Sequence, residues 1–464
     1  MDLQFDYTHM MADVIGPEHG IQERDLLALG DPCQRIHQDL MLRREAGALP
    51  FYDLPFDQQM QDSVMGLAEE LAGRFENVVV LGIGGSALGT LALFRALCPL
   101  HHNLLDRTLR GGRPRLFVQD NVDPDGFAQI LQLLEPVETL FLVISKSGTT
   151  VETSSQFLLA QEWIVRRVPN GWQEHFVLIT DPSKGELRKL VAREGFRSAE
   201  IPAGVGGRFS VFTPVSLLPL ALVGVDIGRL LAGAAEMYGR VTQPVFMQNP
   251  AYLNAVLQFL SVTKGKSISV MMPYSDRLRD VADWYRQLWA ESLGKKFNLG
   301  GEIINAGPTP VKALGTTDQH SQVQLYMEGP FDKVITFLAL KDYGNPLRLP
   351  RMDCAPDLGY LAGKTMAELI CCEQQATALA LAKNQRPNCT IILESVTPEA
   401  VGGLLYWFEV QTVFSGGLYQ LDPLDQPGVE EGKEYTYGLM GRAGYAAKRD
   451  EFEAWNAGLN RRYI

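Results

Sequence analysis

Two short stretches of the sequence combine glycines with hydroxyl side chains in a pattern that suits a bound anion. GIGGSALG at residues 82–89 follows the apolar run VVVL, and SKSGTTVET at residues 145–153 follows the apolar run TLFLVI. Glycines let backbone amides approach a bound group, and the start of a helix adds partial positive charge. Ligands of parallel sheets bind at the carboxyl ends of the strands. Both stretches are therefore expected to converge on one phosphate monoester.

The second stretch carries more polar side chains than the start of a helix needs. Its polar residues are Ser145, Lys146, Ser147, Thr149 and Thr150. One or two hydroxyl side chains are enough to cap a helix. The larger set, with a lysine among it, favours a phosphate clamp over simple capping.

The first stretch also fits a looser dinucleotide-binding pattern. Gly82, Gly84 and Ala87 satisfy G-x-G-x-x-A, but no acidic residue ends a following strand about twenty positions on, and Asp120, the first candidate, lies too far along the chain. No G-K-[ST] closes the loop, which excludes a triphosphate loop of that type. Ser86 lies at the apex of the stretch, where its hydroxyl can donate a hydrogen bond to a phosphate.

Further along the chain, single polar residues could contribute to a site, although an arginine such as Arg208 is usually a surface charge and a glutamate such as Glu291 is usually a solvated helix residue. Arg208 follows two glycines and precedes an apolar helix, and Glu291 lies four residues after Gln287, on the same face of a predicted helix. His320 follows a polar turn, and the tail adds Gln426 and Lys433. The seven histidines are not spaced as metal ligands, so no metal is expected.

The elements that must position these residues alternate between short apolar strands and helices. Strands are predicted at 77–84, 115–120, 139–145, 175–180, 267–274, 333–340 and 389–396. Strands that are apolar on both faces indicate a parallel sheet covered on both sides. We predict an α/β fold of two doubly wound parallel-sheet domains. The predicted boundaries are 1–70 for a helical N-terminal segment, 71–240 and 241–425 for the two domains, and 426–464 for a C-terminal tail.

Composition and charge argue against some kinds of partner and indicate the compartment in which the protein works. The chain has 464 residues with a formal net charge of −12, which argues against a nucleic-acid or anionic-membrane partner. The six cysteines form no regular framework and are expected to be reduced thiols. The start MDLQFDYTHM lacks the features of a signal peptide, so a cytoplasmic protein is expected.

Six motifs, taken in order, resemble those of the phosphoglucose isomerase family. They are GIGGSALG, SKSGTTVET, GVGGRFS, QLWAESLGKK, GTTDQHSQVQ and DQPGVEEGK, and they span residues 82–433. The resemblance implies two sugar-isomerase domains and the reversible conversion of glucose 6-phosphate to fructose 6-phosphate without a cofactor. It also implies a homodimer whose active site lies at the interface and receives its histidine from the partner chain.

The resemblance implies a role for each matching residue. Glu291 resembles the base that moves a proton between C2 and C1, and Arg208 resembles the arginine that steadies the enediolate. His320 and Lys433 resemble the pair that assists ring opening. The residues matching the substrate-binding positions are Gly85, Ser86, Ser145, Lys146, Ser147, Thr149, Thr150, Gly207, Gln287 and Gln426.

The sequence departs from longer family members in three places, and other functions stay open. SKSGTT stands where they commonly read SKTFTT, the histidine turn reads TTDQH, and the chain is shorter at both ends. A non-catalytic sugar-phosphate regulator would need the clamp but not Glu291, His320 and Lys433 together. The hypothesis of a nicotinamide dehydrogenase is supported only by the glycine pattern. A dual isomerase that also takes mannose 6-phosphate is a narrower alternative.

Overall fold

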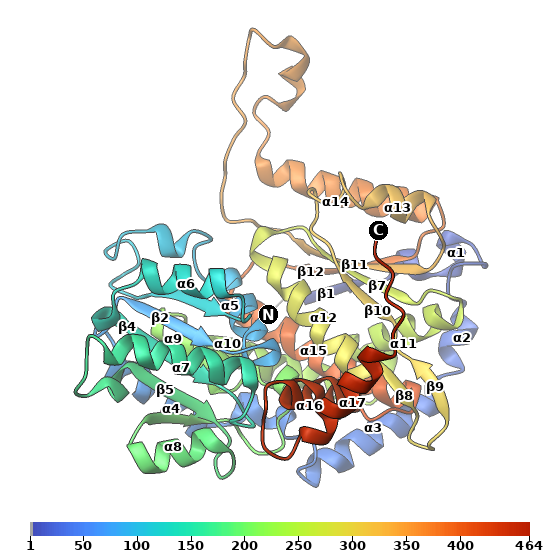
Figure 1. Cartoon of the computed structure of the whole chain (residues 1–464). Coiled ribbons are helices and arrows are strands. Elements are labelled where there is room, and N and C mark those ends of the chain that lie inside the picture. The colour runs from blue at the N-terminus through green and yellow to red at the C-terminus, as the bar shows by residue number, and fades with distance from the viewer. Residues whose placement is uncertain (1–2) are drawn as a thin grey trace.

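The computed structural model describes residues 3–464, which form two five-stranded sheets on opposite sides of the molecule and one small hairpin-like sheet (Figure 1). The first sheet is parallel throughout. Its strands follow the order β3 (Arg115–Gln119), β2 (Asn77–Leu81), β4 (Thr139–Ile144), β5 (Phe176–Thr180) and β6 (Arg197–Glu200).

Helices bury both faces of this first sheet, as its continuous apolar strands require. Successive residues of β2 point to opposite sides, so that Val78 and Val80 join one buried cluster while Val79 and Leu81 join another. The helices of this half are α4 (Gln58–Leu71), α5 (Leu88–Leu97), α6 (Pro124–Leu133), α7 (Val151–Val165), α8 (Glu186–Glu194) and α9 (Pro214–Leu222).

The second sheet is mixed. Its order is β1 (Leu3–Asp6), β12 (Asn388–Leu393), β11 (Lys333–Leu340), β7 (Ile268–Pro273) and β10 (Thr309–Lys312). Only β1 runs antiparallel. The predicted α/β class is confirmed. The expectation of a purely helical N-terminal segment is wrong at residues 3–6, because these residues complete the edge of a sheet formed almost 400 residues later in the sequence.

The remaining helices surround the second sheet or join the two halves. Between β7 and β10 the chain also forms the small antiparallel sheet of β8 (Lys295–Phe297) and β9 (Ile303–Ala306). The helices are α1 (Ala12–Ile15), α2 (Glu23–Leu27), α3 (Gly30–Glu45), α10 (Ile227–Val241), α11 (Pro250–Thr263), α12 (Arg279–Leu293), α13 (Val323–Glu328), α14 (Met366–Lys383) and α15 (Pro398–Tyr419).

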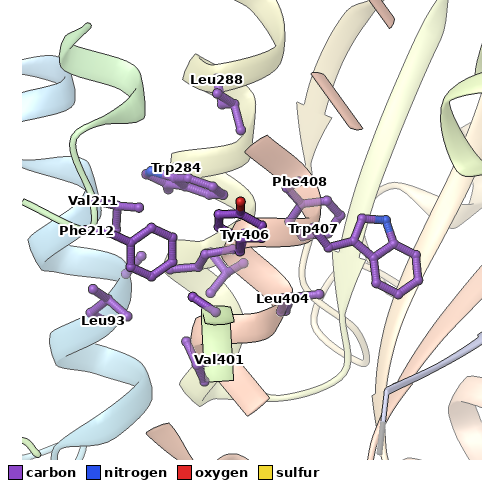
Figure 2. Close-up of a cluster of buried hydrophobic side chains, with 14 of the residues drawn as sticks. Leu93, Val211, Phe212, Trp284, Leu288, Val401, Leu404, Tyr406, Trp407 and Phe408 are labelled. Carbon is purple, nitrogen blue, oxygen red and sulfur yellow. The ribbon is translucent and has the colours of Figure 1, made fainter. Parts of the chain in front are cut away.

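Helix α15 forms the centre of the molecule and is buried over most of its length. It packs against α10, α11 and α12. Figure 2 shows its residue Tyr406 beside Trp284 of α12, with Phe212 and Leu93 of α5 close by, and Phe408 on the other side of Tyr406. This shared cluster links the helices of both halves, so α12 is held on a rigid support.

One carboxyl group lies inside this apolar centre. Glu409 of α15 is fully buried, and neither of its carboxylate oxygens has a hydrogen-bond partner among the described residues. Burial without a partner disfavours the charged form and raises the pKa of Glu409 well above its ordinary value. The proton therefore stays on this carboxyl over a wider pH range than on an exposed glutamate.

Two segments lie outside the packed body. The connection between β11 and α14 projects away from it as an extended arm (Figure 1). The C-terminal segment forms α16 (Glu430–Leu439) and α17 (Ala446–Ala457), which pack against each other. Side chains of these two helices are mostly exposed. The predicted boundaries at 70, 240 and 425 remain proposals.

Candidate active site

Both glycine- and hydroxyl-rich stretches lie at the point where the order of the first sheet reverses. β2 pairs with β3 on one side and with β4 on the other, and the chain passes from β3 back across β2 to β4. Such a switch point opens a crevice at the carboxyl ends of the two central strands. The turns after β2 and β4 therefore lie side by side at one edge of the sheet, and their binding of one phosphate stays a prediction.

The turn after β4 gathers three hydroxyl groups. Ser145 Oγ lies 2.9 Å from Thr150 Oγ1 and 3.5 Å from Ser147 Oγ, and the backbone amide of Gly148 donates to Ser145 Oγ at 3.1 Å. Thr150 occupies the N-cap position of α7, yet its side chain does not cap the helix. The hydroxyls face one another rather than the helix, which favours the phosphate clamp over the capping alternative.

Lys146 adds a positive charge beside this cluster. Its Nζ donates to the carbonyl of Val205 at 2.6 Å. Burial lowers the pKa of Lys146, and the charge of Asp181 opposes that effect. Val205 leads directly into the turn that carries Arg208, so Lys146 connects the clamp to the next part of the site.

The turn after β2 packs against the turn at Gly207–Phe209. A Cβ atom added to Gly85 would lie 2.2 Å from the backbone C and O of Gly207, so only glycine permits this approach. Gly84 has a φ of +57°, and its α-carbon faces the side chain of Gln287. Ser86 lies in the same turn and is partly exposed. These contacts bring residues 84–86 next to α12.

Arg208 lies at the centre of the hydrogen bonds that form the site. It is only 3% exposed, and its Nη1 donates to Glu291 Oε1 at 3.1 Å while its Nε donates to Ser292 Oγ at 2.7 Å. Burial lowers the pKa of Arg208, and the Glu291 carboxylate counters that effect. Gln287 Nε2 donates to the second carboxylate oxygen of Glu291 at 3.0 Å. The Glu291 side chain is 22% exposed, so a ligand in the crevice can reach it.

The loop that follows α15 returns to Arg208. Arg208 Nη2 donates to the carbonyls of Pro423 at 2.5 Å and Asp425 at 3.0 Å, and Nη1 lies 3.3 Å from Gln426 Oε1. Lys295 contacts the same loop. Sequence reasoning assigned no role to Ser292 or Lys295. Their only signal was proximity to Glu291 on or after one helix.

His320 and Lys433 lie elsewhere in the chain. His320 is exposed in the turn after β10, and Lys433 of α16 donates to Glu430 Oε1 at 2.8 Å. Within residues 3–464, no hydrogen bond or ion pair joins either side chain to Arg208 or Glu291. A single chain therefore brings together the clamp, Arg208, Gln287, Glu291 and Gln426, but not the predicted ring-opening pair.

Residues 3–464 contain neither a candidate metal centre nor a candidate membrane span. Over residues 3–464 no group of three or more histidine, cysteine, aspartate or glutamate side chains is arranged to hold a metal ion. In the same range no helix has the length and apolar character needed to cross a membrane.

The α/β fold thus carries a cluster of hydroxyl groups after β4 and a carboxylate–guanidinium pair between α12 and the turn at Gly207–Phe209. The model of the family described as phosphoglucose isomerase matches residues 66–459. A glucose-6-phosphate isomerase of Carboxydothermus hydrogenoformans is 45% identical over 453 residues, covering 97% of this chain and 97% of that protein. The chain belongs to the phosphoglucose isomerase family, which confirms the resemblance seen in the sequence.

A further relative and two solved structures are also similar to this chain. A glucose-6-phosphate isomerase of Rubrobacter xylanophilus is 40% identical over 450 residues, covering 96% of this chain and 100% of that protein. A hypothetical protein from Thermus thermophilus superposes with a TM-score of 0.85 at 34% identity, covering 95% of this chain and 100% of that one. A Chlamydia trachomatis glucose-6-phosphate isomerase, 24% identical, shares the fold with a TM-score of 0.75 over 86% of this chain and 76% of that one.

Proposed function

We propose that this chain interconverts glucose 6-phosphate and fructose 6-phosphate, with Glu291 and Arg208 at the reacting atoms. The observation that carries these roles is the contact between Arg208 Nη1 and Glu291 Oε1 at 3.1 Å, next to the glycine turn after β2. An aldose–ketose isomerisation needs a base next to a group that stabilises a transient oxyanion. This pair supplies both.

The proposed proton transfer uses the Glu291 carboxylate. With the sugar ring open, Glu291 takes the proton from C2 of the aldose, and the electron pair moves through the C1–C2 bond onto the carbonyl oxygen. The enediolate that forms carries a negative charge, which the buried guanidinium of Arg208 stabilises. Glu291 then returns the proton to C1, the proton of the C2 hydroxyl passes to the C1 oxygen, and the C2 oxygen becomes the ketone. Gln287 holds the unused carboxylate oxygen throughout.

The hydroxyl cluster is the proposed anchor for the 6-phosphate. Ser145, Ser147 and Thr150 turn their hydroxyls toward one another at the end of β4, and the partly buried Lys146 adds positive charge nearby. The backbone of Gly85 and the hydroxyl of Ser86 are proposed to approach the same ligand from the turn after β2. A local site of this kind can hold an anion despite the net negative charge of the whole chain.

The first experiment measures turnover of fructose 6-phosphate and glucose 6-phosphate by the purified protein with EDTA and no added cofactor. Glu291→Gln is expected to lower kcat by about 100- to 10,000-fold, the usual contribution of a general base. Binding of 6-phosphogluconate should persist because the clamp is untouched. Glu69→Gln, at an exposed position of α4, is the matched control. Near-normal turnover by Glu291→Gln would contradict the assignment of the base.

A second copy of the chain is the proposed source of the ring-opening histidine. His320 is exposed and does not contact Arg208 or Glu291 of its own chain. A homodimer in which each site combines Glu291 of one copy with His320 of the other would complete the site, and we expect that assembly in the cytoplasm. Lys433, exposed on α16, is the proposed partner of this histidine.

Mixing two inactive variants tests the shared site. Glu291→Gln and His320→Gln homodimers should each be nearly inactive, whereas a mixed dimer keeps one site with both native residues. After denaturation and joint refolding, about one quarter of the native activity is expected from random pairing in a twofold dimer. Glu291→Gln refolded with Glu69→Gln calibrates the refolding yield, because about half of the native activity is expected with or without exchange of copies. Failure of the first mixture to regain activity would place His320 outside the partner's site.

A further inference from the structure

Lys295 is buried just after the helix that carries Glu291. Its side chain is 6% exposed, and its Nζ donates to the backbone carbonyl of Glu291 at 2.7 Å. A lysine near the end of a helix commonly binds a free carbonyl of the last turn. A solvated lysine can serve that purpose, however, so helix capping alone does not account for burial of this charge.

The second set of contacts made by Lys295 reaches a distant part of the chain. Its Nζ donates to the carbonyl of Asp425 at 3.0 Å and lies 3.3 Å from Asp425 Oδ1. Arg208 Nη2 donates to the same Asp425 carbonyl at 3.0 Å. Two buried cations therefore hold one carbonyl, and the side chains of Asp425 and Glu291 balance their charge.

The segment held in this way carries a residue of the proposed site. Residues 423–426 include Gln426, whose Oε1 lies 3.3 Å from the same Arg208 nitrogen that binds Glu291. The chain beyond this segment is mostly exposed: among residues 430–457, burial in α16 is limited to Gly438 and α17 has no buried residue. The tail is thus attached to the site mainly through the loop 423–426, which Lys295 and Arg208 bind.

We propose that Lys295 is a positioning residue that fixes the loop 423–426 against the end of α12 and so keeps Gln426 and Arg208 in register with Glu291. The proposal rests on the isomerase function proposed above. Lys295 acts through the loop and does not touch the substrate. Without its charge, the carbonyl of Asp425 loses one of its two donors and the Asp425 carboxylate loses its buried partner.

The test compares Lys295→Met with Lys296→Met. Lys296 is the exposed neighbour of Lys295 and lies over the ring of Phe297, so the control removes the same charge one residue away. Lys295→Met is expected to lower kcat by up to roughly 100-fold, the size of effect that a misplacement of about 1 Å can produce. The KM for fructose 6-phosphate should change far less. Lys295→Arg should restore most of the loss, and Lys296→Met should match the native protein.

Hydrogen exchange supplies a readout that does not depend on activity. Backbone amides of residues 421–430 should exchange faster in Lys295→Met than in the native protein, with smaller changes elsewhere. Asp425→Asn, which keeps the carbonyl and alters an exposed side chain, should show a weaker form of the same change and remains informative if Lys295→Met does not fold.

The outcomes separate this proposal from the proposed function. Absence of turnover in the native protein would refute the isomerase function, and the exchange comparison would then decide the role of Lys295 alone. If turnover is present, a kcat of Lys295→Met within twofold of native would overturn the proposal. Unchanged exchange of residues 421–430 in both the Lys295 and Asp425 variants would also overturn it.

Discussion

The two large sheets share one strand order but differ at the point where that order reverses. β10, β7, β11 and β12 repeat the arrangement of β3, β2, β4 and β5. In the first sheet the switch point is lined by Ser145 and its neighbouring hydroxyls. In the second it is filled by Tyr274, which is fully buried directly after β7. The topology provides a place for a ligand, and the side chains that occupy that place decide whether a ligand can enter.

Tyr274 is held on several sides. Its hydroxyl donates to Gln319 Oε1 at 2.6 Å, its carbonyl accepts from the hydroxyl of Tyr343 at 2.5 Å, and its ring packs against the backbone of Gly315. Residues 315–320 form the turn that carries His320. Tyr274 at the second switch point therefore supports the turn that carries His320.

Among the tests of this contrast between the two sheets, the largest effect is expected when the side chain of Tyr274 is removed from the second switch point. Tyr274→Ala is expected to destabilise the protein by about 3–5 kcal/mol, as for other buried aromatic side chains replaced by alanine. Urea unfolding followed by circular dichroism measures the change, and Tyr360→Ala, at a position 76% exposed, is the control. A loss below about 1 kcal/mol would mean that Tyr274 does not fill this place tightly.

A smaller effect is expected from removing one hydroxyl of the first switch point. Ser145→Ala should weaken phosphate binding by roughly 10- to 100-fold, the cost of losing a hydrogen bond of about 1.5–3 kcal/mol to a charged group. The change should appear in the KM for fructose 6-phosphate and in the Kd of 6-phosphogluconate. Ser275→Ala, at the matching end of β7, should leave both constants unchanged. Equal effects of the two variants would remove the distinction between the two sheets.

The sequence predicted most of the first sheet and much of the site because both have local signals. β2, β4 and β5 are apolar on both faces, and the turns after β2 and β4 concentrate glycine and hydroxyl residues. β1, β6 and β10 were missed because each has four residues, some of them polar and exposed. Such short strands form because a neighbouring edge is available, and that edge is visible only in the folded chain.

The parts of the candidate site that the sequence did not reveal were missed for a similar reason, because they form only in the folded chain. Pro423 and Asp425 meet Arg208 through backbone carbonyls, which every residue possesses, so no residue type marks them. Gly85 was found from its motif, but its close approach to Gly207 is a property of two turns that lie far apart in the sequence. The ring-opening role of His320 and Lys433 came only from the resemblance, and it remains a prediction.

The unpartnered carboxyl group in the centre of the molecule couples folding to proton uptake. Because the pKa of Glu409 is higher in the folded chain than its ordinary value of 4.5, folding binds a proton at any pH between the two values. The contribution of Glu409 to the free energy of unfolding is fully present below pH 4.5. It is lost as the pH rises toward the pKa of Glu409 in the folded chain, by about 1.4 kcal/mol per pH unit. Raising the pH above 4.5 therefore lowers the stability of the fold through this one buried group, and a pH-stat would register the proton released on unfolding.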